Sequence, residues 1–159
     1  MKKKIICIIG TRPEVIKMAP VISLLNKQSW CVNKVVATAQ HREMLDELVN
    51  FFKIKIDYDL NLMKKNQTLS TLTSKILLKM SKIIDVEKPD LVIVQGDTTS
   101  VFSIALSCFY HKVKVAHIEA GLRTFNMYNP YPEEGNRVLV SKLAHFNFAP
   151  TADSFKNLI

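Results

Sequence analysis

The sequence predicts an α/β fold, a doubly wound parallel sheet with helices on both faces. Two observations predict it. Short, unbroken apolar runs recur along the chain, as is typical of strands buried on both faces of a sheet. Between them lie longer segments whose apolar residues recur at helical spacing. Ligands of such sheets bind beyond the carboxyl ends of the strands, so a site is expected in the loops that follow the strands.

Length and composition narrow the class of protein. The 159 residues, 48% of them hydrophobic, suit one domain with its own core. No apolar run approaches the roughly 20 residues that span a bilayer, and no cleavage site follows the basic N-terminus, so we expect a cytoplasmic protein without membrane contact. Cys7, Cys31 and Cys108 lie far apart in apolar segments, which predicts buried free thiols. The net charge of +8 raises nucleic acid as a partner, but the basic residues are scattered, and none is expected.

The first strand and helix are expected within residues 5–25. Residues 5–9 are an apolar run, and Gly10 permits the sharp turn that follows. Pro13 suits the first helical position, and apolar residues continue at helical spacing to residue 25. Arg12 and Lys17 flank the helix start, where free N–H groups and partial positive charge favour anions. Either they form a phosphate cradle, or they are solvated cations beside an ordinary tight turn.

The next segments repeat this alternation of strand and helix. Residues 33–38 predict a second strand, and residues 43–52 predict an amphipathic helix after a polar turn. Residues 56–62 alternate well enough for a short, peripheral strand. Residues 67–86 predict the longest helix, which Lys88-Pro89-Asp90 stops.

The last third of the chain completes the pattern. The sequence predicts a strand at 91–94, a helix at 101–110 and a strand at 114–118. Residues 133–137 then lead into a helix that runs to residue 144. A strand at 146–149 and a helix that begins at Pro150-Thr151 follow. This alternation, with its continuous apolar strands, implies a parallel, doubly wound sheet.

Glycines and arginines share the loops expected at the carboxyl edge of the sheet. All four glycines and all four arginines lie in or near these loops: Gly10, Gly96, Gly121 and Gly135, with Arg12, Arg42, Arg123 and Arg137. Glycine lets a ligand approach the backbone, and arginine recognises anions through two parallel hydrogen bonds. The sequence therefore predicts a crevice that binds an anion.

Carboxylates lie in the same loops, although they do not help to bind phosphate. Asp97 and Glu119 follow two neighbouring expected strands, and Glu133 and Glu134 precede a helix. Asp97 and Glu133 could cap the helices beside them. The alternative is that these carboxylates act as acids or bases on a neutral part of the ligand. Glu119 favours this alternative, because it precedes no expected helix that it could cap. His117 is either a core residue at the end of a strand or a support for the site.

Five motifs resemble those of the non-hydrolysing UDP-N-acetylglucosamine 2-epimerases, in the family's order and along the whole chain. They are Gly10-Thr11-Arg12-Pro13-Glu14, Thr38-Ala39-Gln40-His41-Arg42-Glu43-Met44-Leu45, Gly96-Asp97-Thr98-Thr99, His117-Ile118-Glu119-Ala120-Gly121-Leu122-Arg123-Thr124 and Pro132-Glu133-Glu134-Gly135-Asn136-Arg137. The resemblance implies the glycosyltransferase-B (GT-B) architecture, two Rossmann-like domains with the active site between them. It implies interconversion of UDP-GlcNAc and UDP-ManNAc, by elimination and re-addition of UDP, for bacterial surface polysaccharides. It implies neither a cofactor nor a metal.

Roles carried over from the resemblance fall on matching positions of this chain. The implied catalytic carboxylates are Asp97, Glu119 and Glu133. The implied contacts to the nucleotide-sugar are Arg12, Lys17 and Arg137. In some bacterial members the motif that contains Gln40 and His41 meets a second, activating UDP-GlcNAc.

The sequence departs from the family in two places. Gly135 stands where the family usually has alanine, and the chain ends at Ile159, where family members continue into a second domain. Residues 1–159 are thus expected to be an N-terminal domain, inactive without a C-terminal domain in cis or in trans, and part of a homodimer when full length. The alternatives are a non-catalytic remnant or interaction module, or the acceptor-side domain of a glycosyltransferase, because a fold alone does not fix function. The three carboxylates favour epimerisation over transfer.

Overall fold

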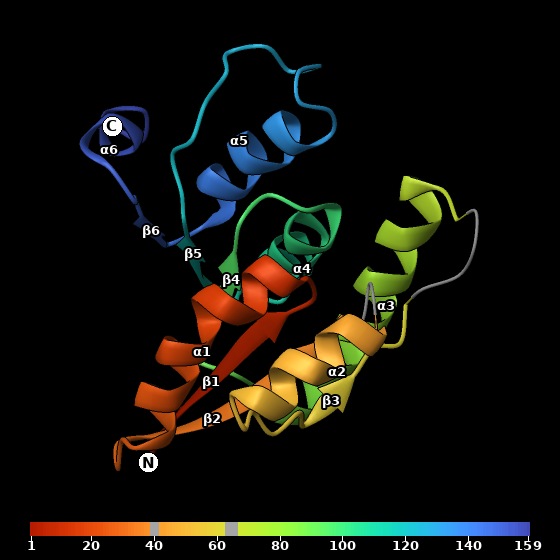
Figure 1. Cartoon of the computed structure of the whole chain (residues 1–159), viewed down its shortest axis with the longest axis vertical. Coiled ribbons are helices and arrows are strands. Elements are labelled where there is room, and N and C mark those ends of the chain that lie inside the picture. The colour runs from red at the N-terminus through yellow and green to blue at the C-terminus, as the bar shows by residue number, and fades with distance from the viewer. Residues whose placement is uncertain (39–41, 63–66) are drawn as a thin grey trace.

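The computed structural model describes residues 1–38, 42–62 and 67–159 and has a six-stranded sheet at its centre. The strand order is β3-β2-β1-β4-β5-β6, and all neighbouring strands are parallel (Figure 1). The strands are β1 (Lys3–Ile9), β2 (Cys31–Ala37), β3 (Tyr58–Asp59), β4 (Leu91–Gln95), β5 (Lys114–Ile118) and β6 (Phe146–Phe148). The order reverses between β1 and β4, and the carboxyl ends of these two strands flank the crevice in which ligands of such folds bind.

Helices cover both faces of the sheet. They are α1 (Arg12–Asn26), α2 (Arg42–Phe51), α3 (Leu69–Glu87), α4 (Thr99–Tyr110), α5 (Glu133–Leu143) and α6 (Ala152–Lys156). Alternate residues of β1 enter two separate cores: Ile5, Cys7 and Ile9 pack with α1 and α2, whereas Ile6 and Ile8 pack with α3, α4 and α5. The strand is buried on both faces, as its unbroken apolar sequence predicts, and the doubly wound fold is confirmed.

The predicted elements are confirmed with small differences at their ends, apart from the third strand. β3 is a pair of residues, Tyr58 and Asp59, at the edge of the sheet. The residues after it do not continue the strand, because the backbone turns at Asn61, whose φ is 42°. Leu60 and Leu62 are nevertheless buried in the core beside α3, which explains their apolar character.

The start of α1 differs slightly from the prediction. The helix begins at Arg12, so Pro13 is its second residue, still within the first turn where no N–H is needed. Thr11 is the N-cap, and its hydroxyl accepts a hydrogen bond from the backbone N–H of Glu14. The Glu14 carboxylate in turn accepts one from the backbone N–H of Thr11. This reciprocal arrangement is a capping box, which satisfies two N–H groups at the helix start.

The three cysteines are buried and unpaired, as predicted. Burial raises the pKa of the Cys7 and Cys108 thiols to about 12, and the neighbouring Cys31 adds to the rise at Cys7. No helix formed by the described residues is long and apolar enough to cross a bilayer.

Two glycines make the turns that follow β4 and β5. Gly96 and Gly121 have φ values of 84° and 89°, in the left-handed region that favours glycine. A Cβ atom on Gly121 would lie 2.1 Å from the backbone oxygen of Ser154 in α6, whereas one on Gly96 would meet nothing within 4 Å. Gly121 is therefore required for packing, and Gly96 for its backbone conformation alone.

We expect Gly121→Ala to destabilise the protein more than Gly96→Ala. Left-handed strain costs alanine about 1 kcal/mol at either position. At Gly121 the overlap with Ser154 adds about 2 kcal/mol, because α6 must shift to admit the methyl group. Urea unfolding of the two variants and the wild type, followed by circular dichroism, measures both losses. Equal losses would contradict the packing argument.

Candidate functional site

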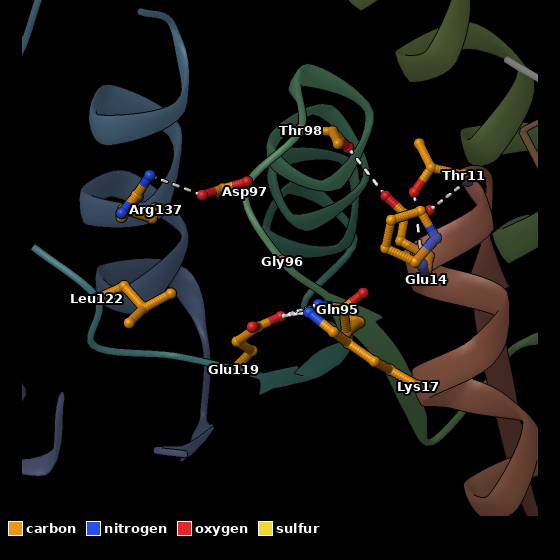
Figure 2. Close-up of a pocket in the computed structure, with 11 residues that line it drawn as sticks. Thr11, Glu14, Lys17, Gln95, Gly96, Asp97, Thr98, Glu119, Leu122 and Arg137 are labelled. Carbon is orange, nitrogen blue, oxygen red and sulfur yellow. Dashed lines mark hydrogen bonds and ion pairs between the residues drawn. The ribbon is translucent and has the colours of Figure 1, made fainter. Parts of the chain in front are cut away.

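A cavity of about 230 Å³ opens at the carboxyl edge of the sheet, between the start of α1, the turns after β4 and β5, and α5 (Figure 2). Four of the predicted site residues border it: Lys17, Asp97, Glu119 and Arg137. The full lining is Thr11, Pro13, Glu14, Lys17, Gln95, Gly96, Asp97, Thr98, Glu119, Leu122 and Arg137. The cavity lies where a doubly wound sheet places its ligand site.

One side of the cavity is an ion pair between α1 and the end of β5. Nζ of Lys17 lies 2.6 Å from Oε2 of Glu119. The side-chain amide of Gln95, the last residue of β4, donates a hydrogen bond to the same oxygen. Glu119 has a φ of 65°, a left-handed conformation that is uncommon for a residue other than glycine. The chain leaves β5 in this conformation, with the Glu119 carboxylate directed toward Lys17 (Figure 2).

The opposite side of the cavity is a second ion pair. Nη2 of Arg137, in α5, lies 2.8 Å from Oδ2 of Asp97, in the turn after β4. Burial raises the pKa of Asp97, and the positive charge of Arg137 opposes the rise, whereas the negative charges of Glu133 and Glu119 add to it. Asp97 is therefore held between a cation and two other carboxylates.

The turn that carries Asp97 is fixed by side chains from two other elements. Nε2 of His117, in β5, donates a hydrogen bond to the carbonyl oxygen of Gly96 at 2.7 Å. Nδ2 of Asn136, in α5, donates one to the carbonyl oxygen of Asp97 at 2.9 Å. The N-cap of α4 is Thr98, whose hydroxyl accepts a hydrogen bond from the first turn of the helix. The capping alternative for Asp97 is therefore wrong, because Asp97 lies one residue before the N-cap.

His117 supports the site from within the sheet. Its side chain is fully buried, and a carbonyl oxygen can only accept, so Nε2 carries the proton. Burial lowers the pKa of the ring, which favours the neutral form. Both interpretations of this histidine therefore hold, since it is a strand residue of the core that positions the turn bearing Asp97.

Glu14 lies at the start of α1, with its carboxyl group directed toward Thr98 (Figure 2). Its side chain is 5% exposed, its Oε2 is 3.0 Å from the backbone nitrogen of Thr11, and its Oε1 is 3.4 Å from the Thr98 hydroxyl that donates to it. No lysine or arginine whose side chain is described forms an ion pair with it. Burial raises the pKa of Glu14 to about 7, and hydrogen bonds from Thr11, Thr98 and the backbone of Gly10 oppose the rise.

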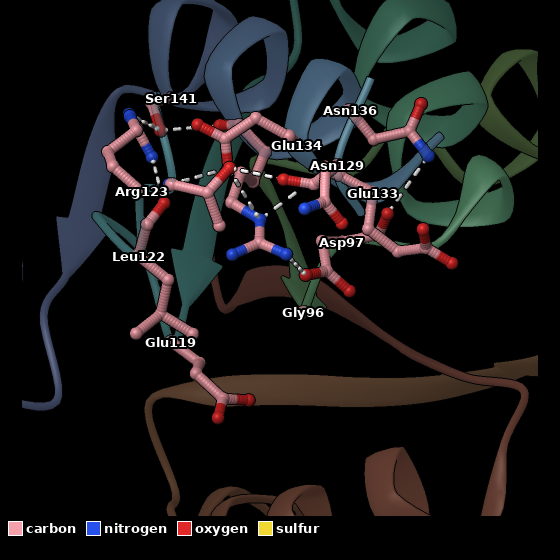
Figure 3. Close-up of polar contacts among 12 residues, drawn as sticks. Gly96, Asp97, Glu119, Leu122, Arg123, Asn129, Glu133, Glu134, Asn136 and Ser141 are labelled. Atoms are coloured by element: carbon pink, nitrogen blue, oxygen red, sulfur yellow. Dashed lines mark hydrogen bonds and ion pairs between the residues drawn. The ribbon is translucent and has the colours of Figure 1, made fainter. Parts of the chain in front are cut away.

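The two acidic residues at the start of α5 have different environments (Figure 3). Glu134 is 1% exposed and accepts hydrogen bonds from the backbone N–H groups of Thr124 and Phe125, at 3.0 and 3.1 Å. It thereby anchors the loop between β5 and α5. Glu133 is the first residue of α5, is partly exposed and does not border the cavity. The capping alternative for Glu133 is wrong, because the N-cap is Pro132 and the helix has no side-chain cap.

The arginines do not share one crevice. Arg137 borders the cavity, but Arg12 is exposed at the start of α1 and does not line it. Nη2 of Arg123 donates a hydrogen bond to the hydroxyl of Ser141 in α5, at 2.9 Å (Figure 3). The side chain of Arg42 lies outside the part of the chain that the structure describes. Arg123 lies in the loop after β5, as expected, but it does not line the cavity and holds this loop against α5.

Two predicted residues cannot be placed, and two others were missed. Gln40 and His41 lie outside the described residues. Glu14 and Gln95 border the cavity but were not predicted. The spacing of Thr11 and Glu14 is that of a capping box, so it could have identified Glu14 as a fixed carboxyl group at the helix start. No sequence signal identifies Gln95, whose role depends on the direction of one side chain at a strand end.

The arrangement suits an anionic ligand that must lose a proton. Two cations border the cavity, and each holds a carboxylate that an anion can replace. The carboxylates so released lie beside the ligand as proton acceptors. No group of three or more His, Cys, Asp or Glu side chains in the described part of the chain could hold a metal ion.

Comparison with known proteins identifies relatives of the chain. A family model for UDP-N-acetylglucosamine 2-epimerase matches residues 24–159. The UDP-N-acetylglucosamine 2-epimerase of Neisseria meningitidis is 53% identical over 156 residues, which cover 98% of this chain and 42% of that protein. A crystal structure of the N. meningitidis UDP-GlcNAc 2-epimerase, bound to UDP-GlcNAc, has a TM-score of 0.94 at 54% identity and covers 98% of this chain and 42% of that one.

A more distant likeness concerns the fold alone. MurG of Acinetobacter baumannii is 17% identical, with a TM-score of 0.65 over 92% of this chain and 40% of that one.

The chain spans about two fifths of the length of the curated relatives it matches. With a family model that matches most of its length and relatives about half identical to it, the chain belongs to the UDP-N-acetylglucosamine 2-epimerase family.

Proposed function

We propose that residues 1–159 form the N-terminal Rossmann-like domain of an epimerase that interconverts UDP-GlcNAc and UDP-ManNAc. The observation that carries the proposal is the convergence of Lys17, Asp97, Glu119 and Arg137 on one cavity. These are positions to which the resemblance of the sequence motifs assigns substrate binding and catalysis. The related N. meningitidis structure, bound to UDP-GlcNAc, supports the substrate. The family match does not favour the alternatives of an interaction module or a glycosyltransferase domain.

The proposed reaction removes UDP and a proton from the sugar and returns both. A carboxylate takes the proton from C2 while the bond from C1 to the diphosphate breaks, which leaves a 2-acetamidoglucal. UDP then adds back at C1, and a proton returns to C2 on the opposite face. Asp97, Glu119 and Glu133 are the proposed acids and bases. Positive charge from Arg137 and Lys17 stabilises the departing diphosphate.

The remaining assignments concern groups away from the cavity. Arg12, at the exposed start of α1, is proposed to contact the diphosphate of a substrate that extends beyond the cavity. Gln40 and His41 are proposed to contact a second, activating UDP-GlcNAc.

In the GT-B architecture the cavity forms one wall of the active site, and a second domain, in cis or in trans, supplies the other. We further propose that the full-length enzyme is a cytoplasmic homodimer that serves synthesis of surface polysaccharide.

Replacement of the cavity carboxylates in the full-length enzyme tests the proposed chemistry. Glu119→Gln and Asp97→Asn are each expected to lower kcat about 10²–10⁴-fold, with a smaller change in KM, because each removes a proton acceptor and keeps the side-chain shape. Exchange of the C2 proton with solvent deuterium should fall in parallel, since elimination requires that proton to leave.

Glu133→Gln separates the third carboxylate from the other two. Glu133 does not border the cavity. Loss of C2 proton exchange in Glu133→Gln would therefore show that the second wall brings this carboxylate to the sugar, and wild-type exchange would show that it does not. Wild-type exchange in both Glu119→Gln and Asp97→Asn, combined with lower melting temperatures, would make those carboxylates structural and the proposed site wrong.

Lys17→Met in the full-length enzyme tests the role of the cations. The change removes a charge-assisted hydrogen bond, so kcat/KM is expected to fall about 10–100-fold. Lys156→Met is a matched control, because Lys156 is an exposed residue of α6 that pairs with Asp153 and does not border the cavity. An equal fall in both variants would mean that Lys17 acts only through the net charge of the protein.

The 159-residue chain alone is expected to form little or no UDP-ManNAc from UDP-GlcNAc. A single wall leaves the cavity open to water, which weakens its charge interactions and leaves the diphosphate incompletely held. Anomeric proton NMR of the sugar nucleotides, with the full-length enzyme as a positive control, measures the product. Turnover by the chain at the full-length rate would contradict the proposal that a second domain completes the site.

A further inference from the structure

The charged side chains that line the cavity do not balance one another. Lys17 of α1 and Arg137 of α5 are the cations. Glu14 of α1, Asp97 of the turn after β4 and Glu119 at the end of β5 are the carboxyl groups. With all of these groups ionised, the described lining has one negative charge in excess. Partial positive charge at the N-termini of α1 and α4 offsets some of it, but a dianion that enters still meets an excess of carboxylates.

The three carboxyl groups differ in how firmly their negative charge is held. Glu119 accepts hydrogen bonds from Lys17 and Gln95, and Asp97 pairs with Arg137. Glu14 has neutral partners only among the side chains described, and its burial already favours the protonated form. Glu14 is therefore the carboxyl group that gains a proton at the lowest cost.

Protonation preserves the hydrogen bonds that join Glu14 to the Thr11 backbone and to the Thr98 hydroxyl. The Thr98 hydroxyl has two acceptor lone pairs, of which the backbone N–H of Val101 uses one. A protonated Glu14 can donate from Oε1 to the other, while Oε2 still accepts from the backbone N–H of Thr11. The capping box thus stays closed, and the link between the starts of α1 and α4 survives, whichever form Glu14 adopts.

We propose that Glu14 takes up a proton from solvent when a nucleoside diphosphate sugar, or another dianion, binds in this cavity. The inference rests on the proposed function for the identity of its ligand. Binding forms one O–H bond, at Oε1 of Glu14, and removes the excess negative charge from the lining. Because the bound state holds a proton that the free state loses as pH rises, affinity falls with rising pH.

Calorimetric titration of the 159-residue chain tests the proton uptake. UDP-GlcNAc and sulfate are the probes, since neither titrates between about pH 6 and about pH 9, and two buffers of different ionisation enthalpy give the number of protons taken up. For the wild type, uptake should approach one proton above neutral pH, and Kd should rise about tenfold per pH unit there.

Glu14→Gln is the decisive variant, because its neutral amide imitates the protonated form. The amide oxygen can accept from the Thr11 backbone, and the amide nitrogen can donate to the Thr98 hydroxyl, so the capping box is kept. This variant should lose the proton uptake and keep a nearly constant Kd at alkaline pH. Asp153→Asn, which neutralises an exposed carboxylate of α6 that does not border the cavity, should retain the uptake, and its thermal melting, with that of Glu14→Gln, controls for loss of fold.

The possible outcomes separate this inference from the proposed function. Unchanged uptake in Glu14→Gln, or pH-independent binding by the wild type, would overturn the inference while UDP-GlcNAc binding still supports the function. Sulfate binding with proton uptake but without UDP-GlcNAc binding would keep the inference and count against the function. If the chain binds neither probe, the cavity is not an anion site and the inference fails.

Discussion

Backbone carbonyl groups at the end of a strand need hydrogen-bond partners, and the turn after β4 obtains them from side chains. His117 of β5 donates to the carbonyl oxygen of Gly96, and Asn136 of α5 donates to that of Asp97. Both donors are buried, so water does not compete for these bonds. Because the turn sets the start of α4 and the direction of Asp97, a sheet neighbour and a helix far along the chain jointly determine the geometry of the site.

The sequence predicted most of the fold, and part of the site, for physical reasons. Strands buried on both faces leave continuous apolar runs, so the central strands were readable. The alternating residues 56–62 indicated the edge strand but overstated its length. The convergence of Lys17, Asp97 and Glu119 was predictable because the carboxyl ends of neighbouring parallel strands meet at one edge. The direction of Arg123 depends on a tertiary hydrogen bond with α5. The burial of Glu14 depends on how the starts of two helices meet.

The cavity contains the charge interactions that a ligand would use. Each cation is held by a carboxylate, Lys17 by Glu119 and Arg137 by Asp97, so neither is left in a low-dielectric site without a partner. An entering diphosphate exchanges one anionic partner for another at each cation. The cations therefore remain in place when the ligand binds. At each cation, the free energy of binding reflects the difference between its ion pair with the diphosphate and its ion pair with the carboxylate.

The buried cysteines give each side of the sheet its own reporter of opening. Cys7 and Cys31 belong to the core beneath α1 and α2, and Cys108 belongs to the core beneath α3, α4 and α5. As the thiolate is the reactive form, thiols that are inaccessible and hard to ionise react with alkylating reagents only when their surroundings open. The rates of labelling at Cys7 and Cys108 therefore distinguish a sheet whose two layers separate together from one in which a single layer detaches first.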